Sequence, residues 1–227
     1  MKQNRNTESG NALWFVMLGI VLLAALTIAV TRGSDSVEQS GDFERYRVQA
    51  TDVMRYTKGI EQAVETMRAR GISENDISFH TDEWGHTDYE HTPAQPNSHH
   101  IFHPEGTGIS FRTLPAASNW EIFGSHKVQD LETSANDLII QAEVSRNVCI
   151  QINMLMDITN PVGEPPSDDG EPPSDDIDAV DPYVGSFANG AGVDLTIGDD
   201  AAELAGEQVG CREDAGSFYY YHALIPR

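Results

Sequence analysis

The chain has 227 residues, enough for one medium-sized domain with a hydrophobic core and some accessory segments. Its formal net charge of −22 makes nucleic acid and anionic membrane surfaces unsuitable partners, because like charges repel. Apolar residues make up an ordinary 39% of the chain, so a folded domain is expected.

An uncharged apolar segment runs from Ala12 to Val30, which is 19 residues. As a helix it just spans a bilayer core of about 30 Å. Lys2 and Arg5 precede it, and mostly acidic sequence follows Arg32, so the positive-inside rule places the rest of the chain outside the cytosol. We expect a single-pass membrane protein. A cleaved secretory signal and a plain membrane anchor are the alternatives.

The polar leader, residues 1–10, meets this apolar segment abruptly at Gly10. The junction resembles the class III leader of type IV pilins and type II secretion pseudopilins. The resemblance implies that a prepilin-type peptidase cuts between Gly10 and Asn11. It further implies that the helix is kept, first as an inner-membrane anchor and then as the core of an extracellular filament. Phe15 departs from the family, which usually has a glutamate five residues after the cut.

The same resemblance implies self-assembly, or co-assembly with other pilin-like subunits, through residues 11–31. Small residues in this helix allow neighbouring helices to approach closely. The expected assembly positions are Leu13, Phe15, Gly19, Ala24 and Ala25. With Phe15 in place of the glutamate, the usual charge neutralisation between subunits cannot occur, so a minor pilin fits as well as a major one.

A second helical pattern is predicted over residues 36–70. Its apolar residues recur in steps of three and four and define one face: Phe43, Tyr46, Ala50, Val53, Tyr56, Ile60, Val64 and Met67. Charged residues, Glu61 among them, fill the other positions, and Gly71 suits the end of the helix. Gly33 and Gly41 lie between the two helical stretches, so the sequence leaves open whether the helix is continuous.

Residues 71–147 are predicted to form a loop followed by an antiparallel sheet, and a last strand comes near the C-terminus. The expected strands are 108–113, 120–123, 126–131, 138–144 and 218–225, with a tight turn at Gly124-Ser125. A short helix capped by Ser145 should end by Asn160-Pro161. The predicted class is α+β, with a long N-terminal helix packed on a small antiparallel sheet.

The two cysteines, Cys149 and Cys211, both follow the apolar segment. A single disulfide in an oxidising compartment is the economical interpretation, and free cytosolic thiols are the alternative. The bridge would enclose most of residues 148–227. Type IV pilins similarly close a C-terminal region with a disulfide.

An exact tandem heptapeptide, Gly-Glu-Pro-Pro-Ser-Asp-Asp, occupies residues 163–176. Its prolines and like charges predict an extended, solvated insert. A calcium site is the sharper hypothesis, because carboxylates are hard oxygen ligands. Its ligands would come from Asp168, Asp169, Asp175, Asp176, Asp178 and Asp181.

Histidines gather between positions 80 and 103, namely His80, His86, His91, His99, His100 and His103. Imidazole and nearby carboxylates can bind zinc or copper, but the spacing is irregular and prolines mark a loop. A polar connection between helix and sheet is the alternative. The sequence lacks the nucleophile elbow and phosphate-loop motifs, so we predict that the protein is not an enzyme.

These patterns favour a pilin-like or pseudopilin-like structural subunit that needs no cofactor. The alternative is a permanently anchored extracytoplasmic binding domain, metal-binding through the histidine-rich loop.

Overall fold

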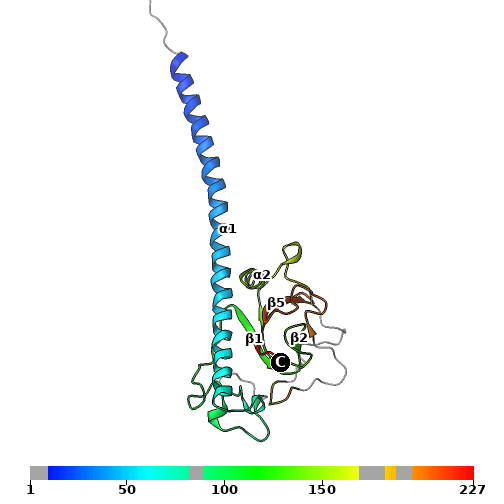
Figure 1. Ribbon diagram of the computed structural model, residues 1–227. Coiled ribbons are helices and arrows are strands. Elements are labelled where there is room, and N and C mark those ends of the chain that lie inside the picture. Colours follow the sequence, from blue (N-terminus) through cyan, green and yellow to red (C-terminus); the bar gives the residue numbers. More distant parts are fainter. Residues whose placement is uncertain (1–9, 82–88, 169–181, 188–195) are drawn as a thin grey trace, which may run out of the picture. The chain divides into compact units, whose positions relative to one another are not determined.

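The structure is a computed structural model that describes residues 10–81, 89–168, 182–187 and 196–227 (Figure 1). Within helix α1 it leaves out the side chains of residues 10–13, 25–26 and 28–40. The chain divides into two compact units, Met1–Arg45 and Tyr46–Arg227. We call the second unit the head. Helix α1 (Gly10–Ala69) contributes residues to both units.

The head is an α+β domain, as predicted. Its main sheet is antiparallel, in the order β1-β3-β6-β5, and consists of β1 (Ala117–Phe123), β3 (Leu138–Val144), β5 (Val209–Asp214) and β6 (Ser217–Ile225). A small parallel pair joins β2 (Lys127–Val128) to β4 (Thr196–Ile197). The remaining elements described are α2 (Arg146–Leu155) and the 3-10 turns Glu74–Asp76, Asn97–His99 and Pro161–Gly163.

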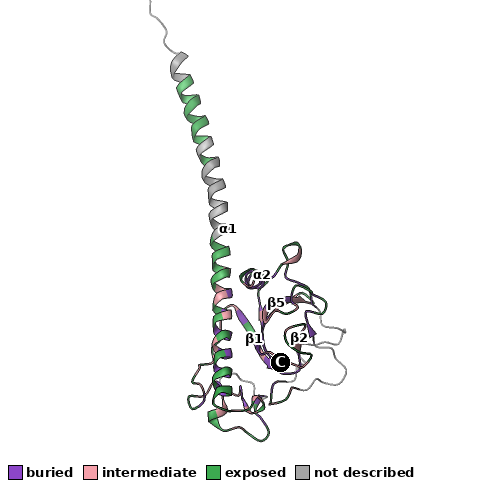
Figure 2. Cartoon of the chain, in the orientation of Figure 1, coloured by how far each residue is buried: buried purple, intermediate pink, exposed green. Residues whose placement is uncertain are grey.

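The head portion of α1 buries the face that the sequence predicts. Val53, Ile60 and Met67 are fully buried in one core with residues of β1, β3 and β6 (Figure 2). Burying one such side chain stabilises the fold by about 1.5–3 kcal/mol. The helix ends where Gly71 adopts a φ of +86°, which only glycine takes without strain.

Glu61 corrects the prediction for this helix. The sequence pattern places it on the solvent face, but only 5% of it is exposed. Its position one turn after Thr57 places it on the flank of the apolar face, and β6 covers that flank.

Four of the five predicted strands overlap a strand of the structure, and one does not. Strand β3 has the predicted bounds, and the strands at 120–123, 126–131 and 218–225 correspond to part of β1, to β2 and to β6. The segment 108–113 is not a strand, because Arg112 donates its backbone N–H to the Tyr56 hydroxyl at 3.0 Å and the segment lies on α1. Gly124-Ser125 does not close a hairpin, since β1 pairs with β3 and β2 pairs with β4.

Helix α2 and strand β5 are joined by the Cys149–Cys211 disulfide, which confirms that prediction. Ser145 caps the helix by accepting the backbone N–H of Val148, also as predicted. Strand β5 itself was not predicted. Its outer edge is covered at Cys211, where the Asn153 carboxamide bonds both the backbone N–H and the backbone C=O at 2.9 Å.

Farther along, the outer edge of β5 is covered by the chain itself. Glu213 donates its backbone N–H to Pro166 at 2.8 Å and accepts one from Asp168 at 3.0 Å. The first residues of the acidic repeat thus lie beside the sheet, whereas residues 169–181 fall outside the described residues.

Among the residues described, none of the helices combines the length and the apolar character needed to cross a bilayer. Several side chains of the predicted span, residues 11–31, lie outside this description.

Removing the disulfide should destabilise the head. The bridge closes a chain separation of 62 residues, and Cys149→Ser with Cys211→Ser should lower the free energy of unfolding by about 2–4 kcal/mol. Urea denaturation of the variant and of the oxidised parent measures the difference. Reduction of the parent should reproduce it, and equal midpoints would contradict the prediction.

Candidate functional site

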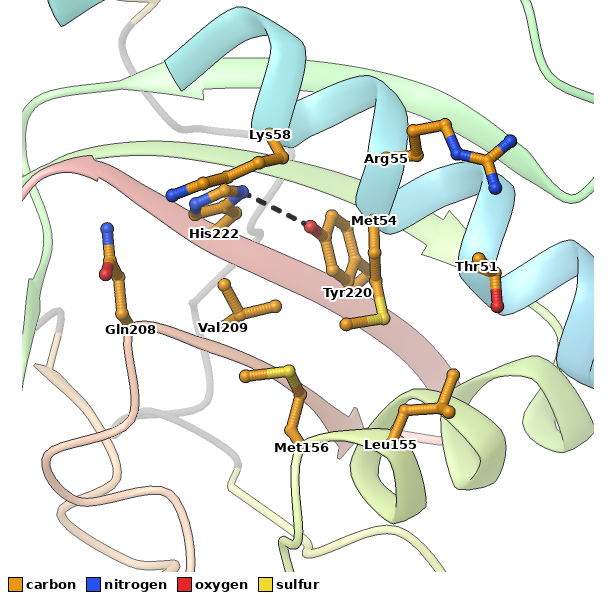
Figure 3. A pocket seen from close by; sticks show the side chains of 10 residues that line it. All are labelled: Thr51, Met54, Arg55, Lys58, Leu155, Met156, Gln208, Val209, Tyr220 and His222. Atoms are coloured by element: carbon orange, nitrogen blue, oxygen red, sulfur yellow. Dashed lines mark hydrogen bonds between the residues drawn. The ribbon is translucent and has the colours of Figure 1, made fainter. Parts of the chain in front are cut away.

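An open groove of about 530 Å³ lies on the head between α1 and α2. One wall is α1, the other is the C-terminal end of α2, and strands β6 and β5 form the floor (Figure 3). The residues that line it are Thr51, Met54, Arg55, Lys58, Leu155, Met156, Gln208, Val209, Tyr220 and His222.

The lining of the groove is less acidic than the whole chain, and its two basic residues pair with neighbouring carboxylates of α1, Arg55 with Asp52 and Lys58 with Glu61. The sequence has 36 acidic and 14 basic residues, yet the lining includes Arg55 and Lys58 and no carboxylate. Met54, Leu155 and Val209 supply apolar walls. A groove of this volume with apolar walls and a few polar groups is typical of a binding site.

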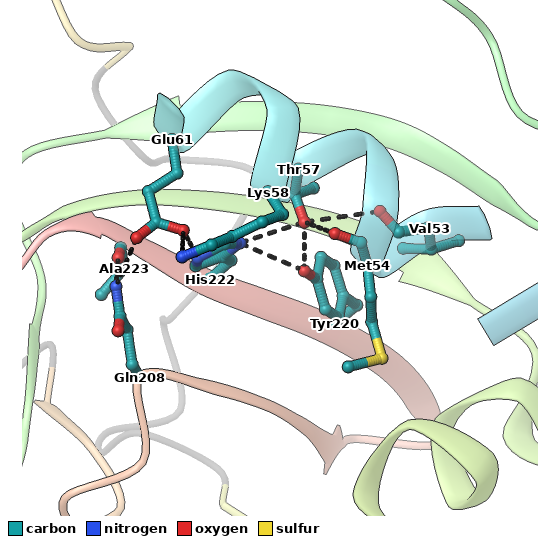
Figure 4. Close-up of polar contacts among 9 residues, drawn as sticks. All are labelled: Val53, Met54, Thr57, Lys58, Glu61, Gln208, Tyr220, His222 and Ala223. Atoms are coloured by element: carbon teal, nitrogen blue, oxygen red, sulfur yellow. Dashed lines mark hydrogen bonds and ion pairs between the residues drawn. The ribbon is translucent and has the colours of Figure 1, made fainter. Parts of the chain in front are cut away.

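A buried polar network lies at the floor of the groove and joins α1 to β6 (Figure 4). His222 is only 2% exposed. Its Nε2 atom lies 3.0 Å from a carboxylate oxygen of Glu61, and its Nδ1 atom lies 3.0 Å from the hydroxyl of Thr57. The hydroxyl of Tyr220 bonds to that of Thr57 and lies 3.4 Å from Nδ1 of His222.

Two residues at the rim complete the network. Lys58 places its ammonium 2.5 Å from the Glu61 carboxylate, and Gln208 donates its side-chain N–H to the Ala223 carbonyl at 2.8 Å. The hydrogen bond from His222 lowers the pKa of Glu61 from 4.5 to about 2, against the opposing effect of burial, and Lys58 adds to the lowering. Burial raises the pKa of Tyr220, so its hydroxyl stays protonated.

A hydroxyl, an imidazole and a carboxylate in a row have the same order as the groups used in nucleophilic catalysis. Here Thr57 is fully buried, and its hydroxyl also bonds to the carbonyl of Met54 in the preceding turn of α1, at 3.1 Å. Tyr220 is fully buried as well. The geometry therefore supports a structural role, in which the network fixes the position of α1 on β6.

The structure brings together some of the histidines that the sequence singles out. The rings of His80 and His100 lie 5.8 Å apart, and those of His100 and His103 lie 6.4 Å apart. His99 contacts the side chain of Gln95 instead, and His91 packs on Tyr183. His86 lies outside the described residues.

Within the described part of the chain, no group of three or more His, Cys, Asp or Glu side chains is arranged to hold a metal ion. Burial lowers the pKa of His91 and of His100. For His100 a backbone hydrogen bond to Gln95 opposes this effect, and the neighbouring His80 and His103 lower the pKa further, so the His100 imidazole is neutral at physiological pH.

Of the six aspartates proposed for calcium, only Asp168 is described, and it has structural contacts. It is fully buried, and its side chain accepts the backbone N–H of Gly198 at 3.0 Å. Its backbone carbonyl accepts a guanidinium N–H of Arg212 at 2.6 Å. Asp169, Asp175, Asp176, Asp178 and Asp181 lie outside the described residues.

The leader and assembly positions are described only in part. The side chains of Gly10, Asn11, Leu13 and Ala25 are not described. Phe15, Gly19 and Ala24 are exposed on α1.

Sequence reasoning missed the groove and its network. One signal was present: His222 interrupts an otherwise apolar and aromatic strand, a position where an ionisable side chain needs a partner. Thr57 and Glu61, four residues apart on α1, are the partners of His222. Nothing in the sequence indicated that α2 would end beside α1 and so complete the groove.

In comparisons with known proteins, no family model, no curated protein and no solved structure matches this chain.

Replacing His222 alone should cost more than replacing it together with Glu61. His222→Leu leaves the Glu61 carboxylate buried with the half-exposed Lys58 and a 3.4 Å hydrogen bond from Gln208 as its partners, and the free energy of unfolding should fall by about 2–4 kcal/mol. The double variant Glu61→Leu, His222→Leu removes both polar groups, so it should recover part of that loss. Urea denaturation of the single and double variants measures the coupling, and additive losses would show that the two groups do not interact.

Glu61 should also make the head sensitive to acid. Because its pKa is about 2 in the folded head and near 4.5 without these contacts, its contribution is complete above pH 4.5 and is lost as the pH falls towards 2. Between pH 7 and pH 2.5 the parent should therefore lose more stability than Glu61→Gln. Thermal unfolding across this range measures both curves, and parallel curves would contradict the assignment.

Proposed function

We propose that the chain is a pilin-like or pseudopilin-like structural subunit, anchored by its N-terminal helix and assembled through it. One observation carries the proposal. Every large apolar side chain from Trp14 to Leu23 is between 45% and 70% exposed on α1. A continuous apolar surface of this kind requires a partner, because exposing it to water is unfavourable.

Lipid and neighbouring copies of the same helix are the two partners that suit such a surface. Before assembly, lipid tails would surround it. In a filament, the helices of other subunits would replace the lipid, and Gly19 would let them approach closely. The polar leader before Gly10 resembles the sequence that a prepilin-type peptidase removes in pilins.

The architecture of the head agrees with this proposal. In pilins the second half of the long helix packs on a small antiparallel sheet, and a disulfide closes the C-terminal region. Here α1 packs on the sheet through Val53, Ile60 and Met67, and the Cys149–Cys211 bridge joins α2 to the edge strand β5. The exposed Phe15 occurs where the family usually has a glutamate, which suits a minor subunit as well as a major one.

A permanently anchored binding domain is the second candidate, and the groove between α1 and α2 is the observation that favours it. In this case the helix would serve as an anchor only, and the leader would stay attached.

Intact-mass analysis distinguishes the two candidates. When the full chain is produced in bacterial membranes together with a prepilin-type peptidase, the subunit proposal predicts a mature chain that begins at Asn11 and remains in the membrane fraction. A chain that keeps residues 1–10 would favour the anchored binding domain. A soluble chain that starts after Arg32 would contradict both.

Two variants serve as controls. Gly10→Leu should block cleavage without releasing the protein from the membrane, because the apolar helix is unchanged. Leu18→Lys with Leu22→Lys should release it, since each charge costs about 2.5–3.5 kcal/mol at the centre of a membrane helix.

A further inference from the structure

A buried imidazole nitrogen in the histidine-rich loop has no hydrogen-bond partner. His91 is only 5% exposed, and its Nε2 atom is buried without a partner among the described residues. Such an atom is costly to bury, because it has lost its contact with water and has gained no hydrogen bond in exchange. A bound group that interacts with this nitrogen would remove the cost.

The surroundings of His91 keep its ring neutral. Burial lowers the pKa of this imidazole and the nearby His100 lowers it further, against the opposing effect of Asp76. The influence of His100 also shows that the two rings lie within electrostatic reach of each other. Neutral imidazole is the form of histidine that binds metal ions, because one of its nitrogens then has a lone pair.

His100 has the hydrogen bond that is typical of a metal ligand. Its Nε2 atom lies 3.1 Å from the backbone carbonyl of Gln95. A carbonyl can only accept, so Nε2 has the proton, and the neutral ring has its lone pair on Nδ1. Histidines that bind metal ions generally donate their other ring N–H to a carbonyl, a carboxylate or water, which fixes the ring in the correct tautomer.

His80 lies beside His100 on a fixed part of the backbone. Ser78 pairs with His100 in a parallel bridge, and the fully buried Ile101 donates its backbone N–H to Ser78 at 2.9 Å. The ring centres of His80 and His100 are 5.8 Å apart. Two imidazoles on one tetrahedral ion, each with a metal–nitrogen distance of about 2 Å, have ring centres roughly 5 Å apart, so small rotations suffice.

His103 is also close to His100, but its hydrogen bond is of the opposite kind. Its Nδ1 atom accepts the backbone N–H of Glu105 at 3.2 Å. In the neutral ring the proton is therefore on Nε2, and no lone pair is left for a metal ion. This histidine belongs to the same cluster without the tautomer of a ligand, which makes it a matched control.

We propose that His80, His91 and His100 bind a divalent transition-metal ion, for which zinc is the probe, since imidazole suits zinc and copper. In the described part of the chain, no three side chains of this kind already surround one point. The rings therefore turn about their side-chain torsions when the ion binds, and water completes the coordination. The inference goes beyond the proposed function, because a filament subunit and an anchored binding domain can each contain such a site.

Calorimetric titration of the full chain in detergent with zinc chloride tests the site. Excess Ca²⁺ is present throughout, because it occupies carboxylates and binds imidazole poorly. The parent should bind one zinc ion per chain with a micromolar or lower dissociation constant. His100→Gln and His91→Gln should each weaken binding by about tenfold or more. His103→Gln should bind zinc as the parent does.

Thermal unfolding of the same proteins supplies a second measurement. Without zinc, His100→Gln and His103→Gln should have midpoints close to that of the parent, which shows that both fold. Zinc should raise the midpoint of the parent and of His103→Gln but not that of His100→Gln, because a ligand stabilises only the state that binds it.

Two results would overturn the proposal. If the parent takes up no zinc near one ion per chain, there is no metal site, and the buried nitrogen of His91 is met by water. If His100→Gln and His103→Gln bind zinc equally well, these ligands are wrong. Neither result depends on cleavage after Gly10, so the test is separate from that of the filament subunit.

Discussion

The packing of one helical face on one strand supports the rest of the head. Val53, Ile60 and Met67 of α1 are fully buried in the core, and the Glu61–His222 pair lies directly beside them. Apolar burial supplies most of the attraction but tolerates sliding, because it is not directional. The hydrogen bonds of His222 to Glu61 and Thr57 are directional, so they set the register of the helix on β6. The groove depends on this register, since α1 forms one of its walls.

Local signals predicted much of this fold. The three-and-four spacing of apolar residues identified the buried face of α1, Ser145 marked the start of α2, and β3 was found with its bounds because it is a compact apolar run. The errors came from long-range effects. Strand β5 contains Gly210, Arg212, Glu213 and Asp214, and it is a strand because of its pairing with β6 and its bridge to α2 rather than its propensity.

The candidate site was less predictable than the fold. The groove is formed where α1, α2 and two C-terminal strands meet, and no local pattern encodes such a meeting. The prediction that Glu61 lies on the solvent face of α1 was wrong, because it assumed that a carboxylate on a helix flank is solvated, as is normally the case. The histidines are clustered in sequence, which suggested a metal centre, but in the structure His91 packs on Tyr183 and His99 contacts Gln95. A metal site that also used residues 82–88 stays a prediction, since those residues are not described.

The covered edge of β5 limits how copies of the head can associate. An open strand edge presents unpaired amides and carbonyls, and another chain can continue the sheet there without any sequence match. In this head, Asn153 occupies that position at Cys211, and the chain around Pro166 and Asp168 occupies it at Glu213. Backbone addition is therefore blocked along this part of the edge. Contacts between copies at this part of the edge must instead be made by side chains. Such contacts depend on the sequence of the partner, whereas the strand stacking of amyloid does not.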